Sequence, residues 1–169
     1  MTSKETAYFA TGCFWGAERR FWQLPGVIET SVGYMGGSKS EPTYKEVCTG
    51  LTGHAETVAV HFDPNQISYL RLLAEFWMMH DPTSLNQQGN DIGTQYRSEM
   101  FYRNEAEKAQ FEAARDRAKE IWGDGIVTQI TEAPKFWTAE EYHQDFFEKN
   151  PNQGYCNAVV APKMAKVRK

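Results

Sequence analysis

The pattern of apolar and polar residues changes from that of a strand to that of a helix at Cys13. An apolar run ends just before this residue, and from Phe14 onward apolar residues recur at a helical spacing. We therefore predict a strand over residues 7–11 and a helix over residues 14–23, which a Leu-Pro-Gly sequence stops. Cys13 lies at the junction of the two.

Periodicity, caps and turn residues predict the rest of the chain in the same way. We expect further strands over residues 27–34, 56–63, 98–103 and 126–132, and helices from Ser68 to about His80, from Asn104 to Gly123 and from Thr138 to Asn150. Residues 43–57 show no clear period until the strand that begins at residue 56. Residues 83–97 form a long polar loop with glycines, which in a small domain indicates a functional or a disordered segment.

The same periodicity indicates which side chains face the core. The expected inward-facing residues are Val58, Val60 and Phe62 in a half-buried strand, Leu70, Leu73 and Trp77 after Ser68, and Phe111, Ala114, Ala118 and Ile121 after Asn104. Strands and helices are interleaved, which predicts an α/β (α+β) fold: a two-layer sandwich of helices on a mixed, mainly antiparallel sheet. Periodicity leaves the order of the strands open.

Composition is that of an ordinary globular protein. The chain has 169 residues, of which 41% are hydrophobic and 24% charged, and a net charge of −4. We expect one domain over residues 1–169, with residues 157–169 as a flexible basic tail. The negative net charge argues against nucleic acid as a partner, and no apolar stretch is long enough for a membrane span or a signal peptide. The expected location is the cytoplasm.

Three cysteines are too few and too odd in number for a disulfide scaffold. Cys13 begins a helix, where free N–H groups and the helix dipole favour a thiolate, so it is a candidate nucleophile beside an apolar pocket. The alternative is a small buried thiol at a tight turn. We interpret Cys48, which follows the apolar Val47, as a structural thiol.

Several kinds of site find no support in the sequence. There is no glycine fingerprint for a dinucleotide or phosphate, so a redox enzyme of this sequence would take its electrons from outside. No group of residues has the spacing of metal ligands. A papain-type Cys–His dyad is a further alternative, although the local sequence typical of that nucleophile is missing; its candidate histidines are His54, His61, His80 and His143.

Five short motifs occur in order along the chain: Gly-Cys-Phe-Trp-Gly at residues 12–16, Pro-Thr-Tyr at 42–44, Gly-His-Ala-Glu at 53–56, Gly-Asn-Asp-Ile-Gly-Thr-Gln-Tyr-Arg-Ser at 89–98 and Gly-Tyr-Cys at 154–156. Together these motifs resemble the A type of peptide methionine sulfoxide reductase. The resemblance implies a ferredoxin-like sandwich with long functional loops and a C-terminal coil. It also implies reduction of the S epimer of methionine sulfoxide, free or in peptides and proteins, as repair of oxidative damage.

For the first chemical step, the resemblance implies that Cys13 attacks the sulfoxide sulfur and Glu56 is the general acid. Glu56 must then be partly buried, because burial raises the pKa of a carboxyl group. Phe14 and Trp15 would form the wall that receives the substrate's methyl group. The alternatives are a solvated charge for Glu56 and ordinary core packing for the two aromatic residues.

For the rest of the cycle, the resemblance assigns hydrogen-bond donors, an ordering group and a second thiol. Tyr44 and Tyr96 would donate to the sulfoxide oxygen, and Asp91 would order the site unless it is a simple turn residue. Cys156 would form a disulfide with Cys13 that thioredoxin, or dithiothreitol in vitro, reduces. Residues 157–169 contain no further cysteine, so the expected cycle uses two cysteines and no bound cofactor.

Two other classes of function remain as alternatives. A thiol peroxidase or general thiol–disulfide oxidoreductase could also use Cys13 and Cys156, but it would not need a protonated Glu56. A non-catalytic module could bind peptides or sense oxidation through Cys13. Our leading hypothesis is a monomeric methionine sulfoxide reductase with thioredoxin as its partner.

Overall fold

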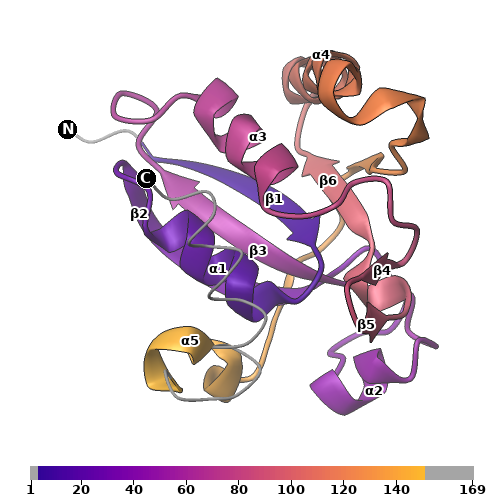
Figure 1. Cartoon of the computed structure of the whole chain (residues 1–169). Coiled ribbons are helices and arrows are strands. Elements are labelled where there is room, and N and C mark those ends of the chain that lie inside the picture. The colour runs from indigo at the N-terminus through magenta and orange to yellow at the C-terminus, as the bar shows by residue number, and fades with distance from the viewer. Residues whose placement is uncertain (1–3, 151–169) are drawn as a thin grey trace.

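The computed structural model describes residues 4–150 of the chain (Figure 1). In chain order its elements are β1 (Glu5–Thr11), α1 (Phe14–Trp22), β2 (Val27–Met35), α2 (Tyr44–Cys48), β3 (Ala55–Phe62), α3 (Tyr69–Met78), β4 (Gln87–Gln88), β5 (Asp91–Ile92), η1 (Thr94–Tyr96), β6 (Ser98–Tyr102), α4 (Glu105–Trp122), η2 (Gly123–Gly125), β7 (Gln129–Glu132), β8 (Trp137–Thr138), η3 (Glu141–His143) and α5 (Phe146–Lys149). Within this range no helix is both long enough and apolar enough to cross a membrane.

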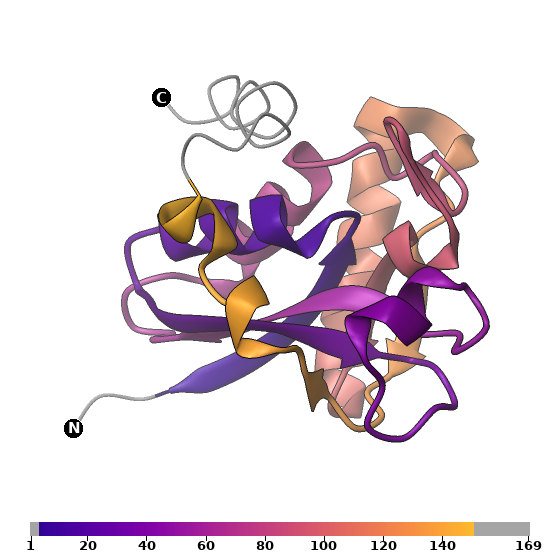
Figure 2. The ribbon, with the colours of Figure 1, turned by 90° about the horizontal axis from the view of Figure 1, so that it is seen from below.

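Six strands form one sheet in the order β7-β6-β1-β3-β2-β8, and β4 and β5 form a separate hairpin. Neighbouring strands of the sheet are antiparallel except β6 and β7, which are parallel. The unit β1-α1-β2-β3-α3-β6 has the ferredoxin-like order, with β1 and β3 in the centre. Figure 2 shows α1 and α3 on the same side of the sheet. The predicted sandwich on a mixed, mainly antiparallel sheet is confirmed.

The main core lies between the sheet and the helices, with Phe9 of β1 at its centre. The Phe9 ring centroid lies 5.3 Å from that of Phe21 in α1, 5.5 Å from Phe76 in α3 and 6.1 Å from Phe111 in α4. All four side chains are fully buried. Aromatic rings at these separations attract one another beyond the area that they bury. Helices α1, α3 and α4 therefore all pack on Phe9 of β1, the strand that leads to Cys13.

Strand β3 is buried on both faces, so the prediction of a half-buried strand was wrong. Val58, Val60 and Phe62 belong to the main core as predicted. The other face belongs to a second apolar cluster formed by Ala10, Met35, Ala55 and Phe101, against which Tyr8, Ala133 and Phe136 pack. The covering residues come from the segment between β7 and β8 and from neighbouring strands. The alternation within β3 carries no information about them.

Most of the predicted inward-facing residues of α3 and α4 are buried. In α3, Leu73 and Trp77 are buried as predicted, whereas Leu70 is 62% exposed. In α4, three of the four predicted residues are buried, and Ile121 at the end of the predicted stripe is 81% exposed. A helical period also accepts apolar residues at the margin of a stripe, and packing on the sheet decides which of them are buried.

The predicted last helix from Thr138 to Asn150 does not form as one element. Thr138 instead pairs with Gly33 of β2 as part of β8. Further on, the side-chain amide of Gln144 accepts from the Val32 N–H and donates to the Val32 carbonyl oxygen, both at 2.9 Å, as a strand residue would. Asp145 then takes a left-handed backbone conformation with φ of 54°. Pairing with β2 outweighs the local helical pattern here.

Local start signals explain several of the remaining boundaries. Ser68 and Asn104 cap their helices as predicted, accepting the N–H groups of the residues three positions later. Residues 43–57, expected to be irregular, contain α2, which begins with a complete capping box between Thr43 and Glu46. The polar loop over residues 83–97 contains the β4–β5 hairpin and η1. Strand β7 begins at Gln129, three residues later than predicted.

Candidate active site

Cys13 is the N-cap residue of α1, directly after β1, as predicted. The preceding Gly12 has a φ of 109°, which L-residues avoid. A Cβ at this position would lie 2.8 Å from Cγ of Gln88 in β4. Glycine therefore permits both the sharp turn from strand to helix and the close packing of the β4–β5 hairpin over it. Cys13 itself is half-buried.

The pKa of the Cys13 thiol is raised well above its ordinary value, the opposite of the predicted shift. Burial is the largest cause, and the negative charges of Glu56 and, to a smaller extent, Asp91 also raise this pKa. The N–H groups of Trp15 and Gly16 lower it, as the helix-start argument expects, but burial and the two carboxylates outweigh them. Cys13 is therefore a neutral thiol at neutral pH in the absence of substrate.

Glu56 of β3 is a buried carboxyl group, and one of its two oxygens has no hydrogen-bond partner among the described residues. It is 2% exposed, so the alternative of a solvated charge is wrong. Its Oε1 accepts the Phe14 N–H at 3.1 Å, whereas Oε2 has no hydrogen-bond partner among the described residues. Burial, assisted by the charge of Asp91, raises the Glu56 pKa to about 8, although the Phe14 N–H lowers it. Glu56 therefore carries a proton at neutral pH.

Tyr44 and Tyr96 come from different parts of the chain and lie close to the same carboxyl group. Tyr44 begins α2 and Tyr96 ends η1. Burial raises the pKa of both hydroxyls, and the charge of Glu56 raises it further. The pKa of Tyr96 is also raised by Asp91 and Cys13. Both hydroxyls stay protonated in the physiological range and can donate hydrogen bonds.

Asp91 is the first residue of β5 and pairs with Gln88 of β4, so it lies in a strand rather than in the turn. Its carboxylate is near enough to raise the pKa of Cys13, Glu56 and Tyr96. The alternative of a simple turn residue does not describe this position. The hairpin thus adds a negative charge to the group of residues around Cys13.

The two aromatic residues after Cys13 differ in their exposure. Phe14 is 1% exposed, with its ring centroid 5.8 Å from that of Tyr34, so it is packed as a core residue. Trp15 is half-buried. Its Nε1 donates to Nδ1 of His143 at 2.9 Å, and its ring is stacked on Phe146 with 3.8 Å between centroids. Of the pair, Trp15 offers the more accessible apolar surface.

Sequence reasoning assigned no role to Glu140 and offered His143 only as one of four candidates for a dyad, yet both contact the predicted site residues. The Glu140 carboxylate accepts the Tyr34 hydroxyl at 2.8 Å and the Tyr44 N–H at 2.9 Å. His143 is fully buried, and its ring centroid lies 4.4 Å from that of Tyr44. Their titratable side chains lie in a segment that we assigned to a helix. The only local signal was the concentration of polar residues over 140–145.

Of the other two cysteines, Cys48 differs from expectation, and Cys156 lies outside the described residues. Cys48, expected to be a structural thiol, is exposed, and its thiol hydrogen-bonds to the side chains of Tyr44 and Gln95 at the edge of the site. Burial of the sulfur and the Glu56 charge raise the Cys48 pKa. Cys156 and the predicted basic tail over residues 157–169 lie outside the described residues.

The histidines do not support a Cys–His dyad, because each has other partners. His54 bonds to Gly37 N–H and the Lys39 carbonyl oxygen, His61 to the Thr6 hydroxyl, His80 to the Phe76 carbonyl oxygen and Ser98, and His143 to Trp15. Over residues 4–150, no three or more His, Cys, Asp or Glu side chains are grouped so that they could hold a metal ion.

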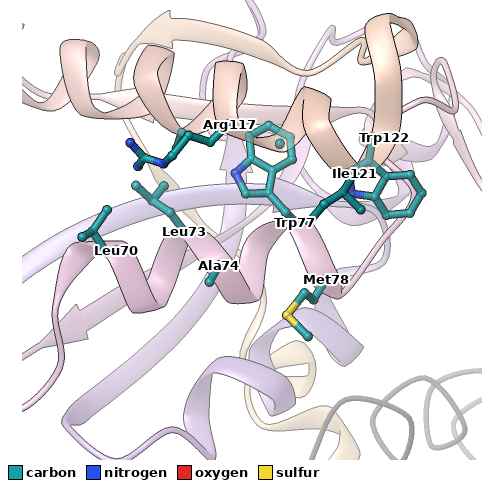
Figure 3. A pocket seen from close by; sticks show the side chains of 10 residues that line it. Leu70, Leu73, Ala74, Trp77, Met78, Arg117, Ile121 and Trp122 are labelled. Carbon is teal, nitrogen blue, oxygen red and sulfur yellow. The ribbon is translucent and has the colours of Figure 1, made fainter.

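A groove of about 540 Å³ between α3 and α4 lies outside this site (Figure 3). Its lining is almost entirely apolar and includes Leu70, Leu73, Trp77 and Met78 of α3 and Ile121 and Trp122 of α4. No carboxylate, thiol or imidazole lines it. The groove explains why two residues of the predicted core stripes are exposed, but it contains no group for acid–base or nucleophilic chemistry.

Comparisons with known proteins agree on one family. Residues 5–169 match the model of the family described as peptide methionine sulfoxide reductase. The chain is 54% identical over 155 residues to the peptide methionine sulfoxide reductase MsrA of Azotobacter vinelandii, which covers 89% of this chain and 71% of the relative. It is 49% identical to MsrA of Acinetobacter baumannii strain AYE over 96% of this chain and 94% of the relative.

Solved structures are similar over the same range. The reduced form of Mxr1 from Saccharomyces cerevisiae superposes with a TM-score of 0.86 at 35% identity, covering 90% of this chain and 89% of that one. Mxr1 in complex with Trx2 superposes with a TM-score of 0.62 at 24% identity, covering 83% and 84%, which supports the fold alone.

Proposed function

The chain belongs to the A type of the peptide methionine sulfoxide reductase family, and we propose that Cys13 is its nucleophile and Glu56 its general acid. It is an oxidoreductase that reduces methionine sulfoxide to methionine by thiol chemistry. One observation carries the proposal: the buried Glu56 has a raised pKa and an oxygen without a hydrogen-bond partner among the described residues, and it lies close enough to Cys13 for its ionised form to raise the pKa of that thiol. Oxygen transfer from the sulfoxide needs a proton donor beside a nucleophile.

In the proposed first step, the Cys13 sulfur attacks the sulfoxide sulfur while Glu56 gives its proton to the sulfoxide oxygen. The oxygen then passes to the Cys13 sulfur, the bond between oxygen and the substrate sulfur breaks, and methionine leaves. Cys13 becomes a sulfenic acid, and the proton of its thiol replaces the one that Glu56 gave. Two electrons pass from Cys13 to the substrate, so this step needs no other reductant.

Tyr44 and Tyr96 are proposed to donate hydrogen bonds to the sulfoxide oxygen as negative charge develops on it. Their raised pKa values support this role, because both hydroxyls remain donors at any pH at which the enzyme works. Asp91 would order these groups from the hairpin side. Its charge also helps to keep Glu56 protonated.

Trp15, together with the neighbouring Phe14, is proposed to receive the methyl group of the substrate. An apolar wall on one side and hydroxyl donors on the other can distinguish the two mirror-image arrangements at the sulfoxide sulfur. The two reductase types of this chemistry each take one epimer, and the resemblance to the A type implies the S epimer. We therefore assign the S epimer to this chain. The substrates are methionine sulfoxide, free and within oxidised peptides and proteins.

Cys156 is proposed to resolve the sulfenic acid. Its sulfur attacks the Cys13 sulfur, a Cys13–Cys156 disulfide forms, and the oxygen leaves as water with the thiol proton. Thioredoxin, or dithiothreitol in vitro, then reduces the disulfide. Mxr1, whose reduced form is 35% identical to this chain, has been solved in complex with Trx2, and this relative supports the proposal that thioredoxin is the partner. The cycle balances with a dithiol alone, which is why we propose that no cofactor is bound.

We propose that this chemistry repairs oxidised proteins in the cytoplasm under oxidative stress. The enzyme would act as a monomer, with one catalytic domain over residues 1–169 and no nucleic acid or membrane as partner. The single six-stranded sheet supports one domain, and the negative net charge argues against nucleic acid as a partner.

A single turnover without added reductant tests the proposed cycle. Pre-reduced enzyme is mixed with each resolved epimer of N-acetyl methionine sulfoxide amide, and methionine formed and thiols lost are counted. We expect one methionine per enzyme and the loss of two of the three thiols, with the S epimer only. Cys13→Ser is the matched control and should form none.

The same experiment separates the alternatives. If neither epimer gives methionine but peroxide consumes two thiols, the chain is a thiol peroxidase and the proposed roles are wrong. If Cys13→Ser forms methionine as fast as the unmodified enzyme, the nucleophile lies elsewhere. Methionine from the R epimer alone would overturn the stereochemical assignment.

A further inference from the structure

Glu18 is a second buried carboxylate on α1, and the proposed chemistry does not use it. It is 2% exposed. Its Oε1 accepts the backbone N–H of Asp145 at 2.7 Å, and its Oε2 accepts the Thr30 hydroxyl at 3.0 Å. A buried acid with both oxygens occupied is a structural anchor rather than a proton donor. The residue that it anchors, Asp145, lies 127 residues further along the chain.

The anchored residue is the point at which the chain enters α5. Asp145 has a φ of 54°, a conformation that costs free energy for a residue other than glycine unless its surroundings impose it. The hydrogen bond from its N–H to Glu18 fixes this peptide. Directly after it, Phe146 stacks on Trp15, and Glu148 forms an ion pair with Arg19. Glu18 thus holds the start of α5 on the helix that Cys13 begins.

Upstream of Asp145, residues 139–144 are already held by β2. Gln144 exchanges two hydrogen bonds with Val32, and its amide also donates to the Ala139 carbonyl oxygen at 3.0 Å. The direction that the chain takes after this clamp depends on Asp145. Figure 2 shows α5 beside α1, on the helical side of the sheet. The hydrogen bond to Glu18, together with the Trp15–Phe146 stack and the Arg19–Glu148 ion pair, therefore sets the direction of the chain after Gln144.

The distance to the proposed resolving thiol makes this direction important. Cys156 follows the last described residue, Asn150, by six positions. Six residues span at most about 20 Å when fully extended. The position and direction of α5 therefore limit where the Cys156 sulfur can reach. A small change in the backbone angles of Asp145 would therefore shift the region that the Cys156 sulfur can reach.

We propose that Glu18 is a positioning residue for the resolving step, because it fixes the origin of the chain segment that carries Cys156. The inference rests on the proposed function, in which Cys156 attacks the Cys13 sulfenic acid. Glu18 does not touch the substrate or the reacting sulfur atoms. We therefore expect Glu18 to affect disulfide formation and not the reduction of the sulfoxide, and the two steps can be measured separately.

The test measures both steps in one turnover of the full-length enzyme. Rapid mixing with N-acetyl methionine sulfoxide amide gives the rate of methionine formation, and quenching with a sulfenic-acid trap gives the lifetime of oxidised Cys13. For Glu18→Ala we expect methionine formation within about twofold of the unmodified enzyme. Disulfide formation should slow about tenfold or more, because a lost orientation reduces the effective concentration of the second thiol.

Three further variants keep the result interpretable. Glu18→Gln can still accept from Asp145 and can donate to Thr30, so it should restore disulfide formation to within about threefold. Thr30→Val removes only the bond on the β2 side and is the matched control, with little expected effect. Glu18→Met fills the space without an acceptor, and it replaces Glu18→Ala as the test variant if the alanine variant does not fold.

A comparison of reductants adds an independent readout. Dithiothreitol can condense directly with a sulfenic acid, whereas thioredoxin needs the disulfide. Glu18→Ala should therefore lose more turnover with thioredoxin than with dithiothreitol. Equal losses in methionine and disulfide formation, or a disulfide rate that is unchanged, would overturn the positioning role. No methionine from the unmodified enzyme would instead refute the proposed function.

Discussion

Two buried carboxyl groups lie at α1 and have different surroundings: Glu56 accepts the Phe14 N–H, and Glu18 belongs to the helix itself. Glu56 and Glu18 are each 2% exposed, and burial is the largest cause that raises their pKa values, to about 8 and about 7. Glu18 has a hydrogen-bond donor at each oxygen. Glu56 has one donor, the Phe14 N–H, and its second oxygen has no partner in the described structure.

The difference shows that a raised pKa does not by itself identify a general acid. Burial raises the pKa at both positions. Glu56 has one oxygen free of hydrogen bonds from the described residues, whereas both oxygens of Glu18 accept hydrogen bonds from the protein itself. The number of hydrogen-bond partners in the empty site therefore distinguishes the proposed proton donor from the proposed anchor. The following predictions test this distinction, with the largest expected effect first.

Cys156→Ser separates the step proposed for Glu56 from the step proposed for Glu18. The variant should form about one methionine per enzyme and then stop with thioredoxin as reductant, because only the resetting of Cys13 fails. A sulfenic-acid trap should label Cys13 and be located there by mass spectrometry of peptides. Continued thioredoxin-dependent turnover, or no label, would show that Cys156 is not the resolving residue.

Glu56→Gln tests the acid side of the comparison. At pH 7 we expect the rate of methionine formation in a single turnover to fall roughly 10²–10⁴-fold, the usual contribution of a positioned proton donor. In the unmodified enzyme this rate should decline above about pH 8, as Glu56 loses its proton. The Gln variant should lack that decline.

Glu18→Gln is the matched control for this pH profile. It should retain the decline near pH 8, because Glu18 does not supply the proton. If Glu56→Gln keeps the rate of the unmodified enzyme, the general acid is another group. If both variants lose the alkaline decline, the two carboxyl groups are not functionally distinct.

The smallest expected effect is on stability. Both pKa values exceed the ordinary value of 4.5, so between pH 4.5 and each raised value the native state binds more protons than the unfolded chain. The free energy of unfolding should therefore fall as pH rises from 4.5 to about 8. Urea unfolding followed by tryptophan fluorescence measures this slope.

The two glutamines should each remove a different part of the slope. Glu18→Gln should flatten the part that ends near pH 7, and Glu56→Gln the part that ends near pH 8. If neither variant changes the slope, the two carboxyl groups do not have raised pKa values in the native protein.

Much of the fold was predictable because the relevant signals are local. The Ser68 and Asn104 caps bond to residues three positions away, and the change of period at Cys13 spans a few residues on each side. The five motifs in order also identified the family, and with it the residues to examine. The helix predicted from Thr138 failed because its strongest contacts are with β2, more than a hundred residues earlier.

Capping and periodicity act within one or two helical turns, so the amino-acid sequence is enough to locate the strand-to-helix boundaries and to name the side chains available for chemistry. The properties of those side chains come from tertiary packing. Packing buries Glu56 and leaves one of its oxygens without a partner among the described residues, raises the Cys13 pKa against the helix dipole, and joins Glu18 to Asp145. Burial, charge proximity and long-range hydrogen bonds depend on segments far apart in the chain, and these become neighbours only on folding.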